Sequence, residues 1–276
     1  MNFKIAITLL AAAIQTYPAL AKDDVFSPNR ISHESLTADP LHTANDSILV
    51  DSLSTEGFVS ITGIPGFGKT KRDLMSHLHA CIMDQGDAFP QQTFKDGTVR
   101  RTIGTVTIPG AGAQPVAFKE GEELSASCQE FNRNLGTFRD TVDETTAAFA
   151  GRLSFEMGSS LSAPLMSTQD GSHVYNDIKE VVASGHHLEH FHSYQKTKES
   201  SSEIQTTIDL HADQGFFIAF SPGLVVAHND DKAPNLSKPL VESEGFYVET
   251  SDGKRSLVQF NAEDDLVFML GDGVNQ

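Results

Sequence analysis

The sequence predicts a mainly β fold with helices in its N-terminal part and a double-stranded β-helix, or jelly-roll barrel, as its core. From residue 204 to residue 276 the chain reads as a series of short strands separated by turn residues at even spacing, which is typical of a jelly roll. Two stretches whose apolar residues recur at helical spacing precede this region. A chain of 276 residues with 39% hydrophobic residues is long enough to bury a full core.

The formal net charge of −17 limits the classes of partner. Such a surface repels phosphate groups and anionic lipids, so we expect no nucleic acid and no membrane surface as a partner. The sequence carries no signal for an oligomeric state.

The first 21 residues are expected to be a cleaved signal peptide. Lys4 supplies a short positive region, an apolar segment runs from Ile5 to Ile14, and Ala19-Leu20-Ala21 forms a cleavage site with small residues. The apolar segment is too short to span a bilayer, and no later run of 18 or more apolar residues follows. We therefore expect a secreted protein.

The next elements divide the chain into a lead-in, an N-terminal region and the core. Residues 22–50 are polar without periodicity and predict an extended lead-in, and residues 51–170 predict an α/β region. This region is expected to contain a strand at 58–62, a helix at 71–85 ended by Gly86, a hairpin within 97–118 and a long supporting helix at 122–157. Residues 171–276 are expected to form the jelly-roll core, with a hairpin at Ser251-Asp252-Gly253.

Two pairs of residues in the N-terminal region have open interpretations. Cys81 and Cys128 are the only cysteines, and they form either one disulfide or two buried thiols on helix faces. Arg100 and Arg101 either bind a substrate carboxylate or form a solvated surface pair.

The segment Gly63-Ile-Pro-Gly-Phe-Gly68-Lys69-Thr70 fits the phosphate-binding P-loop pattern between a strand and a helix. A P-loop sheet requires helices between its parallel strands, and the region after Ile204 has none. A P-loop nucleotide-binding protein is therefore the less favoured alternative.

The sequence around His211 and Asp213 indicates a metal site. Alternate residues of a strand point to the same face, so this His-x-Asp pair can share one ion. One imidazole and one carboxylate are two of the three ligands in the facial triad of non-haem Fe(II) oxygenases. Upstream, His190, His192 and Tyr194 share one face of an expected strand, and the histidines are either packed in the core or part of a separate metal site.

Four segments resemble the isopenicillin-N-synthase-like Fe(II)/2-oxoglutarate-dependent dioxygenases, in the order in which that family places them. They are Glu56–Pro65, Tyr194 with its neighbours, Ile208–Phe220 around the His-x-Asp pair, and Asp265–Asp272 with its final Gly-Asp. The resemblance extends from Glu56 to Gln276 with gaps. It implies that His211 and Asp213 bind Fe(II) and that Tyr194 faces the cosubstrate 2-oxoglutarate.

The family places its second iron-binding histidine, and the basic residue that binds 2-oxoglutarate, beyond the position of Gln276. We therefore expect a chain truncated at its C-terminus and a barrel that is incomplete there. The resemblance implies a dioxygenase that uses dioxygen and 2-oxoglutarate to oxidise a small-molecule or peptide substrate. The alternative from another class is a non-catalytic jelly-roll binding protein.

Overall fold

The structure is a computed structural model. It describes residues 4–9, 24–39, 47–114, 116, 123–158, 166–168, 170–195, 208, 210–213, 215–224, 226–227, 235–236, 242–249 and 253–274.

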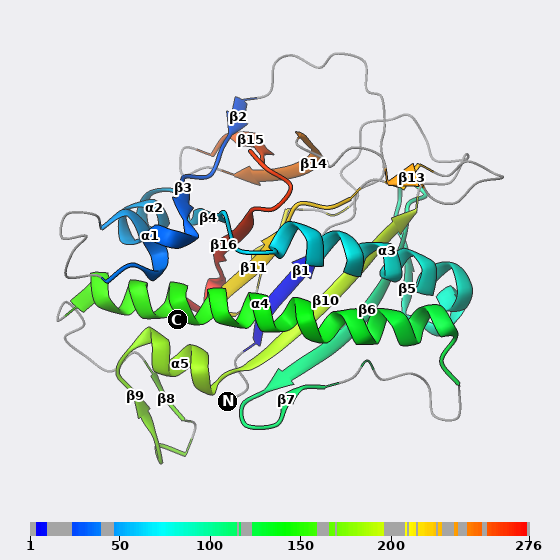
Figure 1. Cartoon of the computed structure of the whole chain (residues 1–276). Coiled ribbons are helices and arrows are strands. Elements are labelled where there is room, and N and C mark those ends of the chain that lie inside the picture. Colours follow the sequence, from blue (N-terminus) through cyan, green and yellow to red (C-terminus); the bar gives the residue numbers. More distant parts are fainter. Residues whose placement is uncertain are drawn as a thin grey trace.

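The fold is organised around a nine-stranded mixed sheet (Figure 1). Its main path runs in the order β3-β4-β16-β11-β1-β10-β6-β5, and β7 pairs with β6 at one side. Going along this path, the strands are β3 (Arg30–Ser32), β4 (Phe58–Thr62), β16 (Leu266–Leu270), β11 (Phe217–Ser221), β1 (Lys4–Leu9), β10 (His186–Gln195), β6 (Val99–Ile108) and β5 (Gln91–Thr93), with β7 at Gly112–Ala113.

A smaller three-stranded sheet covers part of one face of the main sheet. It consists of β14 (Glu242–Glu249), β15 (Arg255–Gln259) and β2 (Asp24–Phe26). Ile218 and Phe220 of β11 pack in one buried cluster with Val258 of β15, so this layer is joined to the main sheet by apolar contacts. Two short pairs complete the strands: β8 (Met166–Ser167) with β9 (Val174–Tyr175), and β12 (Val226–Ala227) with β13 (Asn235–Leu236).

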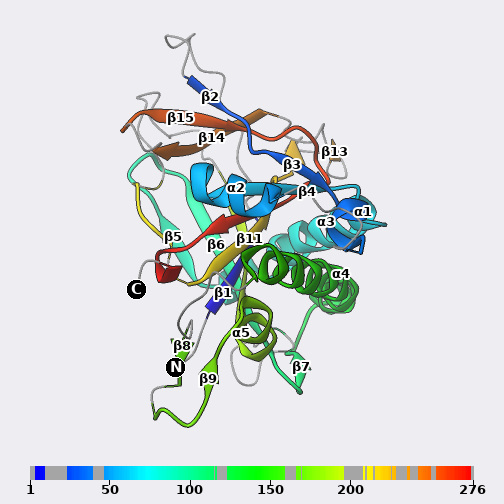
Figure 2. The same ribbon diagram turned by 90° about the vertical axis from the view of Figure 1, so that its left-hand side faces the viewer.

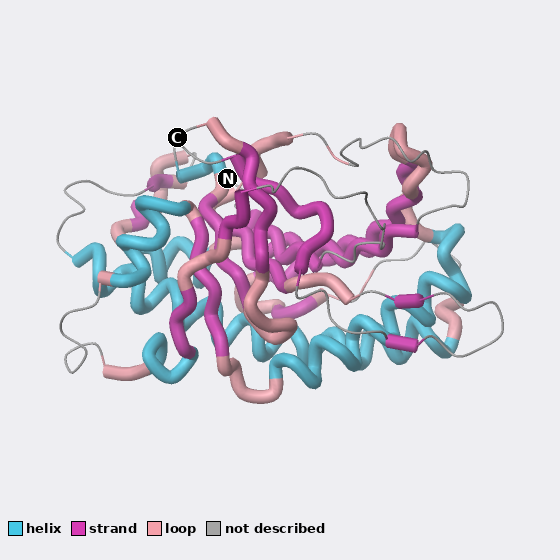
Figure 3. The backbone as a smooth tube through the Cα atoms, turned by 90° about the horizontal axis from the view of Figure 1, so that it is seen from above, coloured by secondary structure: helices cyan, strands magenta, loops and turns pink. Residues whose placement is uncertain are grey.

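The helices pack mainly on the opposite face of the main sheet, where α3 and α4 lie side by side (Figure 2). In the described part of the chain the α-helices are α1 (His33–Thr37), α2 (Ile48–Glu56), α3 (Phe67–Gln85), α4 (Ala126–Met157) and α5 (Ile178–Ser184). Phe131 of α4 contacts Phe191 of β10 edge to face, and Phe149 stacks on Phe268 of β16 with 4.0 Å between ring centroids. The apolar stripe of α4 thereby reaches from β10 to β16. Figure 3 shows the helices (cyan) and the strands (magenta) from above.

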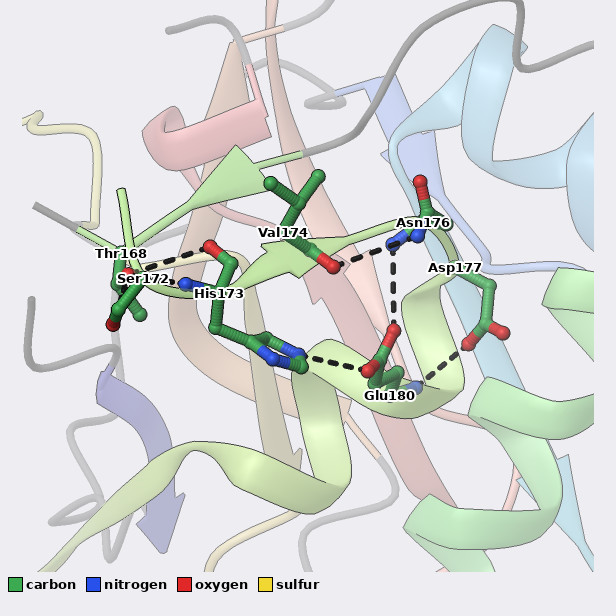
Figure 4. Close-up of polar contacts among 7 residues, drawn as sticks. All are labelled: Thr168, Ser172, His173, Val174, Asn176, Asp177 and Glu180. Atoms are coloured by element: carbon green, nitrogen blue, oxygen red, sulfur yellow. Dashed lines mark hydrogen bonds and ion pairs between the residues drawn. The ribbon is translucent and has the colours of Figure 1, made fainter. Parts of the chain in front are cut away.

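Capping residues explain where the helices begin. The side chain of Ser125 accepts a hydrogen bond from Cys128 N, so α4 begins at Ala126. At the start of α5, Asp177 Oδ1 accepts a hydrogen bond from Glu180 N. The Glu180 carboxylate in turn accepts from Asn176 N and is hydrogen-bonded to His173 Nε2 (Figure 4). These contacts join the β8–β9 hairpin to α5, which leads directly into β10.

Most expected elements are confirmed. The expected helices at 71–85 and 122–157 are α3 and α4, and the expected strand at 58–62 is β4. The hairpins expected within 97–118 and around Gly253 are β6–β7 and β14–β15. The strand expected just before the His-x-Asp pair falls largely outside the described residues.

Three features differ from the expectations. The lead-in is not only extended, because it contains β3 and α1. The expected N-terminal region and the expected core share one sheet. In this sheet β4 and β6 come from the N-terminal region, and β10, β11 and β16 come from the core. Over the described ranges the strands form separate sheets rather than a closed barrel.

The segment expected to be a signal peptide also has a place in the sheet. Lys4–Leu9 forms β1, which pairs in parallel with β10 on one side and with β11 on the other. Within the described residues, no helix is both long and apolar enough to cross a membrane.

Of the two interpretations for the cysteines, the structure shows the disulfide. Cys81 of α3 is bonded to Cys128 at the start of α4, and both residues are fully buried. The bond joins the two helices through cysteines that are 47 residues apart in sequence.

Candidate metal centre

The structure brings His211 and Asp213 together. His211 Nε2 and Asp213 Oδ1 are 3.4 Å apart, and their side chains are 56% and 46% exposed. Two ligands held about 2.1 Å from one ion are about 3 Å apart when they meet at a right angle. The pair therefore has the donor types and the spacing for one shared metal ion, at a position open to solvent.

A distant turn holds the backbone of this pair. Asp272 N donates to Asp213 O at 2.9 Å, Gly273 N donates to Gly215 O at 2.9 Å, and Gly271 N donates to Phe216 O at 3.1 Å. These bonds extend the antiparallel pairing of β11 with β16 beyond the strand ends. The Gly-Asp sequence after β16 therefore fixes the main chain of the segment that contains His211 and Asp213.

Gly271 is required by the closeness of this contact. A Cβ at this position would lie 2.3 Å from Gly215 O and 3.2 Å from Asp213 O. Only a residue without a side chain allows the two backbones to approach in this way.

Within the described residues, no third histidine, cysteine, aspartate or glutamate joins the pair to form a group of three. His228, which lies further along the chain, falls outside the described residues.

Tyr194 lies towards the other end of β10. Leu188 and Ile218 both pair with Ala6 of β1, so they are level in the sheet, and Asp213 precedes β11. Tyr194 lies six residues after Leu188 on β10 (194 − 188), whereas Asp213 lies before Ile218. At a rise of ~3.3 Å per residue, Tyr194 is therefore about 20 Å from the level of Leu188 and Ile218, in the direction away from Asp213. The structure therefore does not bring Tyr194 to the His211–Asp213 pair.

Tyr194 instead belongs to a polar cluster formed by β10 and β6. The register places His192 opposite Thr102 and Tyr194 opposite Arg100. His192 Nδ1 lies 3.0 Å from Thr102 Oγ1, and the rings of His192 and Tyr194 have centroids 6.0 Å apart. These side chains share the sheet face that carries Ile218 and Phe220, which is opposite to the helices.

Burial and positive charge keep the His192 ring neutral. Burial, the charge of Arg100 and the neighbouring His190 lower the pKa of His192 to about 3. Burial raises the pKa of Tyr194, while a hydrogen bond from Arg100 and its charge act in the opposite direction. Near neutral pH the His192 ring therefore has one N–H donor, and the Tyr194 hydroxyl keeps its proton as a donor.

Two buried charged groups escaped sequence reasoning. Arg139 of α4 forms an ion pair with Glu189 of β10 inside the helix-facing core. Lys71 of α3 is fully buried and donates to Ser221 Oγ, Pro222 O and Glu263 O. The sequence did carry one signal for Arg139: it is a charged residue directly after Phe138, within the apolar stripe of α4.

The P-loop alternative finds no support in the contacts of its lysine. Lys69 Nζ lies 2.6 Å from Asp73 Oδ2 one turn along α3. The strand before the loop, β4, pairs in parallel with β3 but antiparallel with β16, so it does not lie in an all-parallel sheet.

Comparisons with known proteins identify the fold. No protein-family model matches the sequence, and no curated protein matches it. Among solved structures, the chain is similar to a protein of Neurospora crassa that has been solved in two forms. The full-length form, in complex with α-ketoglutarate (2-oxoglutarate) and 5-formyluracil, is 13% identical with a TM-score of 0.53, over 94% of this chain and 76% of that one. The C-terminally truncated apo form is 13% identical with a TM-score of 0.51, over 95% and 87% of the two chains. At this identity the likeness establishes a shared fold.

Proposed function

We propose that this protein is an Fe(II)- and 2-oxoglutarate-dependent dioxygenase that oxidises a small-molecule substrate. The observation that carries the proposal is the His211–Asp213 pair, whose donors are 3.4 Å apart at the start of β11. The shared fold supports it, because a solved structure with this fold contains 2-oxoglutarate. The isopenicillin-N-synthase-like resemblance of the sequence points to the same class.

One imidazole nitrogen and one carboxylate oxygen form a donor set that suits Fe(II) and leaves coordination positions for other ligands. When bound, the iron would supply the activation of dioxygen that couples oxidation of 2-oxoglutarate to oxidation of a substrate C–H bond.

The residues of the chain position this site. The hydrogen bond from Asp272 N fixes the carbonyl of Asp213, so the carboxylate starts from a defined main-chain position. Phe216 and Phe217 are buried immediately after the pair and anchor the segment in the core beneath α4. The exposure of both side chains leaves the pair accessible to small molecules from solvent.

The experiment is an Fe(II) titration of the metal-free protein under anaerobic conditions, with His211→Ala and Asp213→Ala beside the wild type. We expect a 1:1 complex in the wild type and at least a tenfold loss of affinity in each variant. His173→Ala is the matched control. His173 also forms an exposed pair with a carboxylate, Glu180 at 2.9 Å, but without the His-x-Asp geometry (Figure 4).

The proposal fails if His211→Ala and Asp213→Ala bind iron as tightly as the His173→Ala control and the wild type. Consumption of 2-oxoglutarate by the iron-loaded wild type, absent in His211→Ala, then tests the dioxygenase assignment itself.

We also propose that the protein is secreted, and cleavage of its leader would then remove β1 from between β10 and β11. The apolar segment with its Ala19-Leu20-Ala21 site supports this, and the Cys81–Cys128 disulfide suits an oxidising compartment. Mass spectrometry of the protein from the medium of an expressing host tests it, since cleavage after Ala21 gives an N-terminus at Lys22.

A further inference from the structure

The charge of Arg100 is unbalanced in its surroundings. Its guanidinium is partly buried beside β10, yet it forms no ion pair with any carboxylate in the described part of the chain. Its Nη2 donates to the neutral Gln92 side chain at 2.7 Å, and its charge lies over the ring of Phe94 at 5.2 Å. Its Nε is buried without a hydrogen-bond partner among the described residues. A buried N–H without an acceptor is costly, and a guanidinium is well suited to an anionic acceptor.

The neighbours of Arg100 are hydrogen-bond donors. Tyr194 lies opposite Arg100 in the register of β10 and β6, so its hydroxyl can accept from the guanidinium and donate its own proton to another acceptor. The neutral ring of His192 carries one N–H, which lies on Nε2 when Thr102 donates to Nδ1. An added Cβ at Gly104 would meet only the His190 ring, at 3.6 Å, so there is room at this point of β6, while His192 itself is only 7% exposed.

Arg101, the next residue, differs from Arg100 in its surroundings, although its Nε is also buried without a hydrogen-bond partner among the described residues. It points to the opposite face, donates to Gln195 Oε1 at 3.1 Å and packs against Gly86 at the end of α3. A positive charge is favourable at the C-terminus of a helix. Arg101 therefore stabilises the end of α3, a role that Arg100 does not have.

We propose that Arg100, His192 and Tyr194 bind the carboxylate of a small organic acid, at a site separate from the metal pair. The planar guanidinium offers paired N–H donors that match the two oxygens of a carboxylate, and the two neutral donors complete the contacts without adding charge. In a chain of net charge −17 this cluster is a local positive site that attracts an anion.

The test is isothermal titration of the metal-free full chain with succinate, 2-oxoglutarate and inorganic phosphate at low ionic strength. We expect the wild type to bind at least one of the two acids more tightly than phosphate. Arg100→Gln should weaken that binding at least tenfold, and the matched variant Arg101→Gln should leave it within twofold. Tyr194→Phe should weaken it severalfold, because one donor is lost while the ring stays.

Folding is checked by near-ultraviolet circular dichroism. If Arg100→Gln does not fold, Arg100→Lys replaces it, since lysine keeps the charge but lacks the paired donors, and a loss of severalfold is expected. The proposal is overturned if the wild type binds neither acid, if phosphate binds equally well, or if the substitutions at 100 and 101 have the same effect.

This outcome is independent of the proposed dioxygenase function. Binding at Arg100 should persist without metal and in His211→Ala, whereas a cosubstrate of the metal centre should require both Fe(II) and His211. Acid binding that appears only with iron, and is lost in His211→Ala, would refute the Arg100 site while supporting the dioxygenase.

Discussion

Replacing Gly271 by alanine tests whether the turn after β16 holds the metal-binding segment. The new Cβ would lie 2.3 Å from Gly215 O, whereas ordinary contacts begin near 3.4 Å. One of the two backbones must therefore move by about 1 Å, because the obstructing atom belongs to the main chain and no rotamer change relieves the contact.

The movement acts on three backbone hydrogen bonds at once, those that Gly271, Asp272 and Gly273 donate to the segment between Asp213 and Phe216. Each contributes about 1 kcal/mol net, so we expect Gly271→Ala to lower the free energy of unfolding by about 2–3 kcal/mol. The same displacement moves the main chain of Asp213, so Fe(II) affinity should fall at least tenfold.

Urea unfolding followed by circular dichroism measures the first effect, and Fe(II) titration measures the second. Gly136→Ala is the matched control: an added Cβ there has no heavy atom within 4 Å, and alanine is favoured over glycine inside α4 by up to about 1 kcal/mol. A Gly271→Ala variant with wild-type stability and iron affinity would refute the reasoning.

Two further predictions concern buried groups. Burial lowers the pKa of Lys71 from 10.5 to about 8, so between these values the unfolded chain binds more protons and the free energy of unfolding should rise with pH, by up to about 3 kcal/mol. Lys71→Met should lack this rise, which paired urea titrations at pH 7.5 and pH 10 would show, and an equal rise in both proteins would contradict it. Replacing Cys81 and Cys128 together by alanine should cost about 4 kcal/mol, the chain-entropy value for a loop of 47 residues, and an unchanged melting temperature would contradict this.

The elements with strong periodicity could be predicted from the sequence, because local patterns determine them. Leu74, Leu78 and Ile82 recur at helical spacing and are buried along α3, and Gly86 ends that helix. Helix starts were less accurate: the structure begins α3 at Phe67 rather than at residue 71, after Gly66 in the left-handed conformation.

Long-range partners could not be predicted, because no local pattern states which strand lies beside which. The pairing of β11 with β16 brings Gly271 onto Gly215, although 56 residues separate them (271 − 215). The placement of Lys4–Leu9 between β10 and β11 is a second example, since the same apolar residues satisfy the pattern of a signal peptide. Composition alone cannot distinguish an apolar leader from an apolar strand.

The two candidate sites follow from the direction of the strands. β10 and β11 run parallel on either side of β1, so the pair before β11 lies near the end at which β10 begins, and Tyr194 and Arg100 lie near the other. The carbon chain of 2-oxoglutarate has four carbon–carbon bonds of about 1.5 Å and spans at most about 6 Å, less than the separation of about 20 Å along β10. One molecule cannot contact both sites in this arrangement. An acid held by Arg100 is therefore a different molecule from a cosubstrate at the metal, and substitutions at the two sites should affect their ligands independently.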